Sequence, residues 1–106
     1  IRSLETPKSD ISPALLERLL GAAPNVVGIK SSNPDRSSFQ EYIHVGGEGF
    51  LILCGVDGLM FPALTPGAAA QVSGNSNVFP ETFRTLDDAF AAGDIERARS
   101  LQRGVN

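Results

Sequence analysis

Residues 24–32 read PNVVGIKSS, and this stretch decides the fold class of the chain. Pro24 and Asn25 interrupt the preceding helical pattern, and a short apolar run without polar alternation follows them. Such a run is typical of a strand that is buried on both faces, as the strands of a parallel sheet are. We therefore predict a buried strand near residues 26–30 that ends at Lys30.

Two further apolar runs follow the first one along the chain. The second covers residues 50–54, and the third, which is weaker, covers residues 68–73. Around these runs, apolar residues recur at helical spacing, with capping or breaking residues at the ends. The helices predicted in this way are one over 13–21, one that starts near Pro34, a short one over 57–64, and the C-terminal helices over 80–103.

The alternation of helices and strands predicts an α/β fold with parallel strands and helical crossovers. Residues 73–77 (SGNSN) are expected to form a loop after the third strand. Three parallel strands alone would leave two apolar edges open, which proteins normally cover, pair or close. We therefore expect residues 1–106 to be a single segment that forms part of a larger sheet.

The composition excludes several classes of protein. Of the 106 residues, 42% are hydrophobic and 20% are charged, and the net charge of −3 is spread along the chain, which excludes a disordered acidic tail. Nine Lys and Arg residues are scattered singly, so no nucleic-acid partner is expected. One cysteine and one histidine form neither an internal disulfide nor a zinc site, so we expect a metal-free, cytoplasmic protein. No run of about 18 apolar residues occurs, so we predict neither a membrane span nor a secretion signal.

In parallel α/β folds, functional sites lie at the carboxyl ends of the strands. The three loops that leave these ends begin at Lys30, Gly55 and Ser73. Lys30 is the only ionisable residue at the end of an apolar strand, where desolvation would disfavour its charged form and free an amine to attack a carbonyl. It is the candidate nucleophile. The alternative is a structural lysine that extends its ammonium group to water.

The other two loops each allow a functional and a structural interpretation. The turn at residues 55–58 (GVDG) could bring bare backbone close to a ligand, or could only connect strand and helix. Residues 73–77 offer hydroxyls and amides but match neither the dinucleotide fingerprint nor the P-loop, so a nucleotide site is not predicted. The residues for which we predict no catalytic role are Tyr42, His44, Cys54, Asp87, Asp88, Glu96 and Arg97.

Three stretches together resemble one enzyme family. They are residues 24–32, the turn at 55–58, and residues 67–80 (GAAAQVSGNSNVFP). Over nearly its whole length, the sequence is similar to the dihydrodipicolinate synthase and N-acetylneuraminate lyase family. The most specific part is Gly-Ile-Lys at a strand end combined with the later Ser-Gly-Asn-Ser-Asn-Val loop.

The resemblance implies the C-terminal three βα units of a (β/α)₈ TIM barrel, strands six to eight, in a class I aldolase or lyase. Lys30 would form a Schiff base with pyruvate or another 2-oxo acid, so that neither a cofactor nor a metal is needed. The substrate-binding residues that the resemblance implies are Gly55 and Val72, through their backbones, and Asp57, Ser73 and Gly74, at the rest of the substrate. The implied partners are the 2-oxo acid, an aldehyde, and either further copies of the chain or the remainder of its own barrel.

Some features of the family are missing from this sequence. A proton-shuttling tyrosine and a carboxylate-binding loop lie further upstream in the family, and Thr6-Pro7-Lys8 replaces the Arg-Thr-Gly that is common in the synthases. We therefore expect an incomplete chain, inactive alone, from an aldolase or lyase for another 2-oxo acid. The alternatives are dihydrodipicolinate synthase itself and a catalytically silent, truncated member that serves as a ligand-binding or assembly module.

Overall fold

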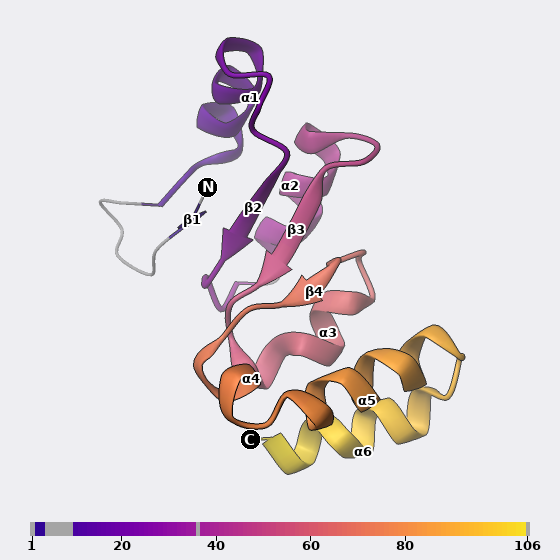
Figure 1. Ribbon diagram of the computed structural model, residues 1–106. Coiled ribbons are helices and arrows are strands. Elements are labelled where there is room, and N and C mark those ends of the chain that lie inside the picture. Colours follow the sequence, from indigo (N-terminus) through magenta and orange to yellow (C-terminus); the bar gives the residue numbers. More distant parts are fainter. Residues whose placement is uncertain (1, 4–9, 36, 106) are drawn as a thin grey trace.

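The computed structural model describes residues 2–3, 10–35 and 37–105. Its four strands form one parallel sheet in which each strand pairs with the next one along the chain. The strands are β1 (Arg2–Ser3), β2 (Gly28–Ser31), β3 (Leu51–Cys54) and β4 (Ala70–Gln71). The helices are α1 (Pro13–Ala22), α2 (Ser37–Gly46), the 3₁₀ turn η1 (Asp57–Leu59), α3 (Met60–Leu64), α4 (Gly74–Val78), α5 (Pro80–Ala91) and α6 (Ile95–Val105) (Figure 1). The predicted α/β fold with parallel strands is confirmed.

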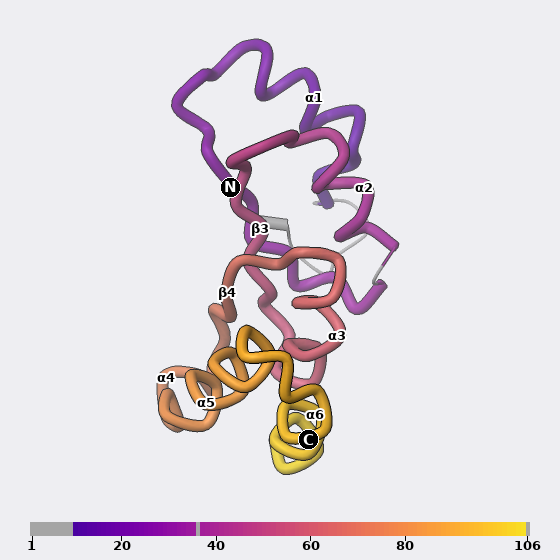
Figure 2. Tube along the Cα trace, turned by 90° about the vertical axis from the view of Figure 1, so that its right-hand side faces the viewer, coloured from indigo at the N-terminus to yellow at the C-terminus, as the bar shows by residue number. Residues whose placement is uncertain are grey.

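One face of the sheet is covered by helices and the other is bare. Helices α1, α2 and α3 lie on the same side of the strands (Figure 2). Ile29 and Ile52 on that side are 1% exposed, whereas Leu51 on the opposite side is 48% exposed. Parallel strands that follow one another in sequence, with their helices on one side, form a (β/α)₈ barrel, whereas a doubly wound sheet carries helices on both faces. The arrangement is therefore a sector of a barrel, and the bare face is its interior.

The first hydrophobic core lies between the sheet and helices α1 and α2. Helix α1 begins where predicted, because the Ser12 side chain accepts a hydrogen bond from the backbone N–H of Leu15 at 3.2 Å and Pro13 takes the first helical position. The buried hydroxyl of Tyr42 donates to the carbonyl of Ile11 at 2.6 Å and ties the residues before α1 to α2. The buried members of this core are Ile11, Leu16, Ile29, Phe39, Tyr42, Ile52, Cys54, Ala63 and Ala68.

Helix α2 begins at Ser37, slightly later than the predicted start near Pro34. The Asp35 carboxylate accepts hydrogen bonds from the backbone N–H of Ser37 at 3.0 Å and from its hydroxyl at 2.8 Å. These hydrogen bonds hold the pKa of Asp35 below its ordinary value. The carboxylate thus satisfies a free donor in the first turn of the helix.

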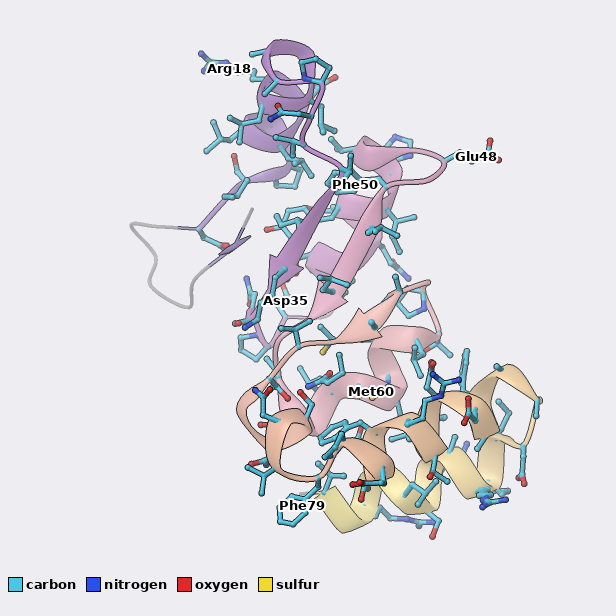
Figure 3. All side chains as sticks on the ribbon, viewed as in Figure 1. Arg18, Asp35, Glu48, Phe50, Met60 and Phe79 are labelled. Carbon is cyan, nitrogen blue, oxygen red and sulfur yellow. The ribbon has the colours of Figure 1, made fainter. Side chains whose placement is uncertain are left out.

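A second core joins α3 to the C-terminal helices α5 and α6. Its buried members are Met60, Leu64, Phe83 and Leu86. The rings of Phe61 and Phe90 meet edge to face, with centroids 6.1 Å apart and an interplanar angle of 81°. Figure 3 shows Met60 between the sheet and α5, whereas Arg18 and Glu48 point outward. The predicted C-terminal helices over 80–103 are thus two helices that pack on one another and on α3.

The structure contains one strand that the sequence did not predict. Strand β1 pairs with Lys30 and Ser31 of β2, so the sheet of the described residues has a short fourth strand in addition to the three predicted ones. A strand of two residues carries no apolar run, and only its pairing with β2 defines it.

The region around the third predicted strand also differs from the prediction. Strand β4 covers only Ala70–Gln71 instead of 68–73, because the N–H of Ala68 is engaged with the carbonyl of Ala63 at 3.0 Å in the turn that follows α3. Residues 73–77, predicted as a loop, mostly belong to α4. Ser73 and Ser76 form a capping box, in which each side chain bonds to the other residue's backbone N–H, and this starts the helix.

The bare face predicts that the 106-residue polypeptide alone is not a stable monomer. Leu51 and Val72 on this face are 48% and 42% exposed, and within the described residues no strand pairs with the outer edge of β4. Exposed apolar faces and unpaired strand edges promote association. We expect light scattering at micromolar concentration to detect oligomers or aggregates, or urea unfolding to lack a cooperative transition. A monomer that unfolds cooperatively would contradict this prediction.

Candidate functional site

Lys30 lies near the carboxyl end of β2, and its strand places it on the bare face. Its neighbours Ile29 and Ser31 are buried toward the helices, and successive side chains of a strand alternate between faces, so Lys30 points to the barrel interior. In the sheet it is paired with Leu53 of β3, which shares this face. The lysine is partly buried.

Gly55 follows β3 and packs against the Lys30 side chain. Its N–H donates to the carbonyl of Ser31 at 2.7 Å, which continues the ladder between β2 and β3 by one residue. A Cβ atom added to Gly55 would lie 2.7 Å from Lys30 Cε and would also overlap the hydroxyl of Ser32. A Cβ here would displace the Lys30 side chain or the Ser32 hydroxyl, so glycine at this position leaves the lysine stem in place.

Asp57 and Ser73 meet at the ends of β3 and β4. The Ser73 hydroxyl donates a hydrogen bond to Asp57 Oδ1. Ser73 is only 7% exposed, and its backbone N–H donates to Ser76 Oγ at 3.0 Å, while its carbonyl accepts from Asn77 Nδ2 at 3.0 Å. The capping residue of α4 therefore also holds the Asp57 carboxylate.

The two remaining candidates differ in how firmly they are held. The N–H of Val72 donates to the carbonyl of Cys54 at 2.8 Å, so its backbone continues the pairing of β4 with β3. Gly74 is the first residue of α4, and a Cβ added there would have no heavy atom within 4 Å. The structure thus joins Lys30 with Gly55 and Asp57 with Ser73, attaches Val72 to the sheet, and leaves Gly74 at the edge of open space.

Cys54 lies beneath these residues as a neutral thiol. Burial raises its pKa, the backbone of Val56 opposes the rise, the Asp57 carboxylate adds to it and the positive charge of Lys30 opposes it. The thiol donates a hydrogen bond to the carbonyl of Val56 at 3.4 Å. A thiol with a raised pKa is a poor nucleophile, which agrees with its predicted structural role.

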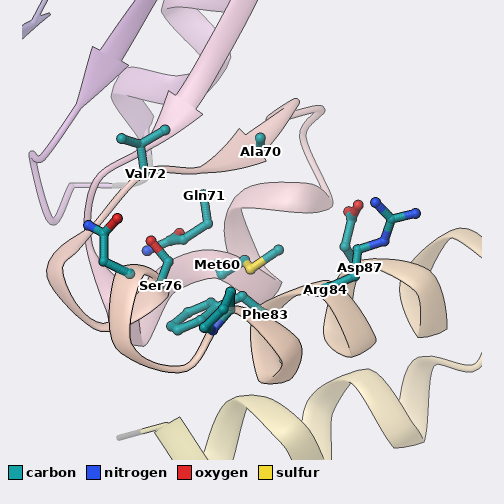
Figure 4. A pocket seen from close by; sticks show the side chains of 10 residues that line it. Met60, Ala70, Gln71, Val72, Ser76, Phe83, Arg84 and Asp87 are labelled. Carbon is teal, nitrogen blue, oxygen red and sulfur yellow. The ribbon is translucent and has the colours of Figure 1, made fainter.

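A pocket lies between β4 and the helices α4 and α5, and residues from both faces of β4 line it. It has a volume of about 470 Å³, and in it Gln71 points toward Ser76, Met60 and Phe83 (Figure 4). Lys30 is not among the residues that line this pocket. The side-chain oxygen and nitrogen of Gln71 are buried, and neither has a hydrogen-bond partner within the described part of the chain.

Gln102 is the residue that sequence reasoning missed. It lies on α6, 41 and 45 residues away from the two backbone groups that it binds, Phe61 N–H and the carbonyl of Asp57. Nothing in the local pattern of α6 distinguishes it from a surface glutamine, and only the tertiary structure shows that it is buried.

Across residues 2–3, 10–35 and 37–105, no group of three or more His, Cys, Asp or Glu side chains is placed to hold a metal ion. No helix in the described ranges is long and apolar enough to cross a membrane.

The fold and the strand-end loops define a (β/α)₈-barrel protein with its candidate site at the carboxyl ends of the strands. The chain belongs to the dihydrodipicolinate synthetase family, whose family model matches residues 5–106. The resemblance derived from the sequence is thereby confirmed, as is the partial barrel fold.

The relatives are named as synthases and lyases. The chain is 33% identical over 91 residues to 4-hydroxy-tetrahydrodipicolinate synthase of Methanopyrus kandleri, covering 86% of this chain and 30% of that protein. It is 40% identical over 92 residues to an uncharacterized DapA-like lyase of Thermoplasma acidophilum, covering 87% of this chain and 31% of the lyase. A prophage protein of the dihydrodipicolinic acid synthase family from E. coli K12, solved in complex with pyruvate, superposes with a TM-score of 0.87 at 25% identity, covering 98% of this chain and 36% of that one. The chain thus spans about a third of the length of these relatives.

The double role of Ser73 predicts a stability effect. Replacing Ser73 by Ala removes both the cap of α4 and the hydrogen bond to Asp57, and should destabilise the complete natural protein that contains these residues by about 1 kcal/mol. Ser73→Thr keeps the hydroxyl and should lose less. The control is Ser100→Ala on the exposed face of α6, and urea unfolding midpoints measure all three. Equal midpoints for Ser73→Ala and Ser100→Ala would show that the cap does not contribute.

Proposed function

We propose that this chain is the C-terminal part of a Schiff-base-forming aldolase or lyase that acts on pyruvate or a related 2-oxo acid. The observation that carries the proposal is the position of Lys30 at the carboxyl end of β2, on the barrel interior, with the bare backbone of Gly55 against its stem. Family membership and the pyruvate complex of the E. coli relative support it.

The chemistry follows from the amine of Lys30. The uncharged Nζ adds to the ketone carbon of the 2-oxo acid, and the carbonyl oxygen leaves as water, so that a C=N bond replaces C=O. In the protonated imine of a 4-hydroxy-2-oxo acid, the 4-hydroxyl then gives up its proton to a base and the C3–C4 bond breaks. The electron pair of that bond moves to the imine, which gives an enamine and an aldehyde. The reverse sequence forms the bond. Because the imine itself is the electron sink, the proposed reaction needs neither a metal nor a cofactor.

The residues around Lys30 divide the proposed site into two parts. The backbones of Gly55 and Val72, which border the lysine end of the sheet, are proposed to approach the 2-oxo acid. The Ser73 hydroxyl already donates its proton to Asp57 Oδ1, so both side chains are proposed to contact the hydroxyl groups of an aldehyde as acceptors. Gly74 leaves open space at the same end, where the remainder of the substrate is proposed to lie.

The bare sheet face is proposed to be covered by the remainder of the same barrel. Lys30 lies on this face, so an upstream segment that closed the barrel would also enclose the lysine. The chain spans about a third of the length of its relatives, which supports an intramolecular cover. Further copies of the assembled barrel are then expected to form the proposed homo-oligomer.

The alternative function is the dihydrodipicolinate synthase reaction itself, which the name of the Methanopyrus kandleri relative favours. The sequence feature that argued against it, Thr6-Pro7-Lys8 in place of Arg-Thr-Gly, lies outside the described residues. The two functions share the imine step on Lys30 and differ in the aldehyde.

Imine formation at Lys30 Nζ can be tested directly by chemical trapping. In the complete natural protein, reduction with borohydride in the presence of pyruvate should attach the pyruvate carbon skeleton to Lys30, and peptide mapping should locate it there. Lys30→Arg should abolish labelling, because a guanidinium stays protonated and forms no imine. Lys8 is the only other lysine of the chain, so Lys8→Arg is the matched control and should label fully. A label on Lys8, or undiminished labelling of the Lys30→Arg variant, would remove Lys30 from this role.

The Asp57–Ser73 pair predicts the choice of aldehyde. Its carboxylate should bind hydroxylated, uncharged aldehydes and repel the carboxylate of aspartate semialdehyde, and Gly58 beside it carries no side chain that could compensate. We expect kcat/KM with pyruvate to be at least about tenfold higher for a sugar-derived aldehyde than for aspartate semialdehyde. Asp57→Asn should narrow that ratio. A higher kcat/KM for aspartate semialdehyde would instead support the synthase function.

A further inference from the structure

Gln102 is the buried polar residue of α6. It is 6% exposed, whereas most neighbouring positions of the helix face solvent. Its Nε2 donates to the backbone carbonyl of Asp57 at 3.0 Å, and its Oε1 accepts from the backbone N–H of Phe61 at 2.8 Å. One carboxamide thus spans the whole turn from η1 into α3.

The turn needs this carboxamide because it has no cap of its own. Val56 precedes η1 and Leu59 precedes α3, and neither side chain forms a capping hydrogen bond. The N–H of Phe61 lies in the first turn of α3, where backbone donors have no partner within the helix. Gln102 supplies the acceptor from a distant helix and at the same time holds the carbonyl of Asp57.

We propose that Gln102 is a positioning residue that fixes Asp57 for the aldehyde part of the substrate; this rests on the proposed function. Asp57 is held at two points, its carbonyl by Gln102 and its carboxylate by Ser73. Without the hydrogen bond from Gln102, η1 can rotate about the hydrogen bond between Asp57 and Ser73, and the Asp57 carboxylate loses its fixed direction. Lys30 lies on β2 and has no part in this arrangement, so the imine step does not depend on Gln102.

The separation of the two halves makes the proposal testable. Gln102→Met in the complete natural protein keeps the length of the side chain and removes both hydrogen bonds. We expect KM for the aldehyde to rise about five- to tenfold, as the loss of one or two hydrogen bonds would produce, while borohydride trapping of pyruvate on Lys30 stays within about twofold of wild type. If this variant does not fold, Gln102→Glu, which keeps the acceptor for Phe61, replaces it with the same expected split.

The matched control is Leu101→Ala, which weakens the packing of α6 on the second core but leaves the carboxamide in place. Its aldehyde KM should remain at the wild-type value. An unchanged aldehyde KM in the Gln102 variants, an equal rise in Leu101→Ala, or an equal loss of pyruvate trapping would overturn the proposal. A wild-type protein that is not trapped on Lys30 would instead refute the proposed function, and this inference with it.

Discussion

The register of β2 on β3 is the constraint on which the site depends. Side chains alternate between faces with a period of two, so a slip of one residue would turn Lys30 into the helix layer and move Ile29 to the bare face. Gly28 helps to hold this register, because its lack of a side chain lets the backbone of β2 approach that of β3. A Cβ atom there would lie 2.6 Å from the carbonyl oxygen of Leu51. The glycine two residues before the lysine is thus a packing requirement of the sheet.

The two halves of the candidate site are held in different ways. Lys30 and Gly55 belong to the sheet, which is supported by the first core between the strands and helices α1 and α2. Asp57 lies in the turn that leads into α3, where Val56 and Leu59 pack against the first core and Gln102 of α6 binds the carbonyl of Asp57. Under the proposed function, a change in α6 would therefore reach the aldehyde part of the site through Gln102, whereas Lys30 is held by its own strand.

The sequence predicted those features that local patterns encode. The apolar runs at 26–29 and 50–54 predicted strands β2 and β3, although β2 covers Gly28–Ser31, and the start of α1 is marked by Ser12 and Pro13. The sequence did not predict α4, because Ser-Gly-Asn-Ser-Asn has the composition of a loop. A capping box usually has Glu or Gln at the third helical position, and the serine found there does not indicate one. Gln102 could not be found either, since both of its partners lie more than 40 residues away. The positions of the candidate site residues came from the family resemblance, which carries information on tertiary structure that a single sequence pattern lacks.

The bare face also bears on the chemistry of Lys30. A lysine that water solvates freely remains an ammonium at neutral pH and is a poor nucleophile, whereas one enclosed by apolar groups and carbonyls gives up its proton more readily. In this chain the helices protect only the far side of the sheet, and Leu51 and Val72 on the near side are open to solvent. Leu53, which is paired with Lys30, lies on the same face, and water is excluded from this face only when a further layer lies over the sheet. Under the proposed function, the closure that buries the exposed leucine and valine would also enclose the side chain of Lys30, so that the proposed imine chemistry depends on the complete barrel.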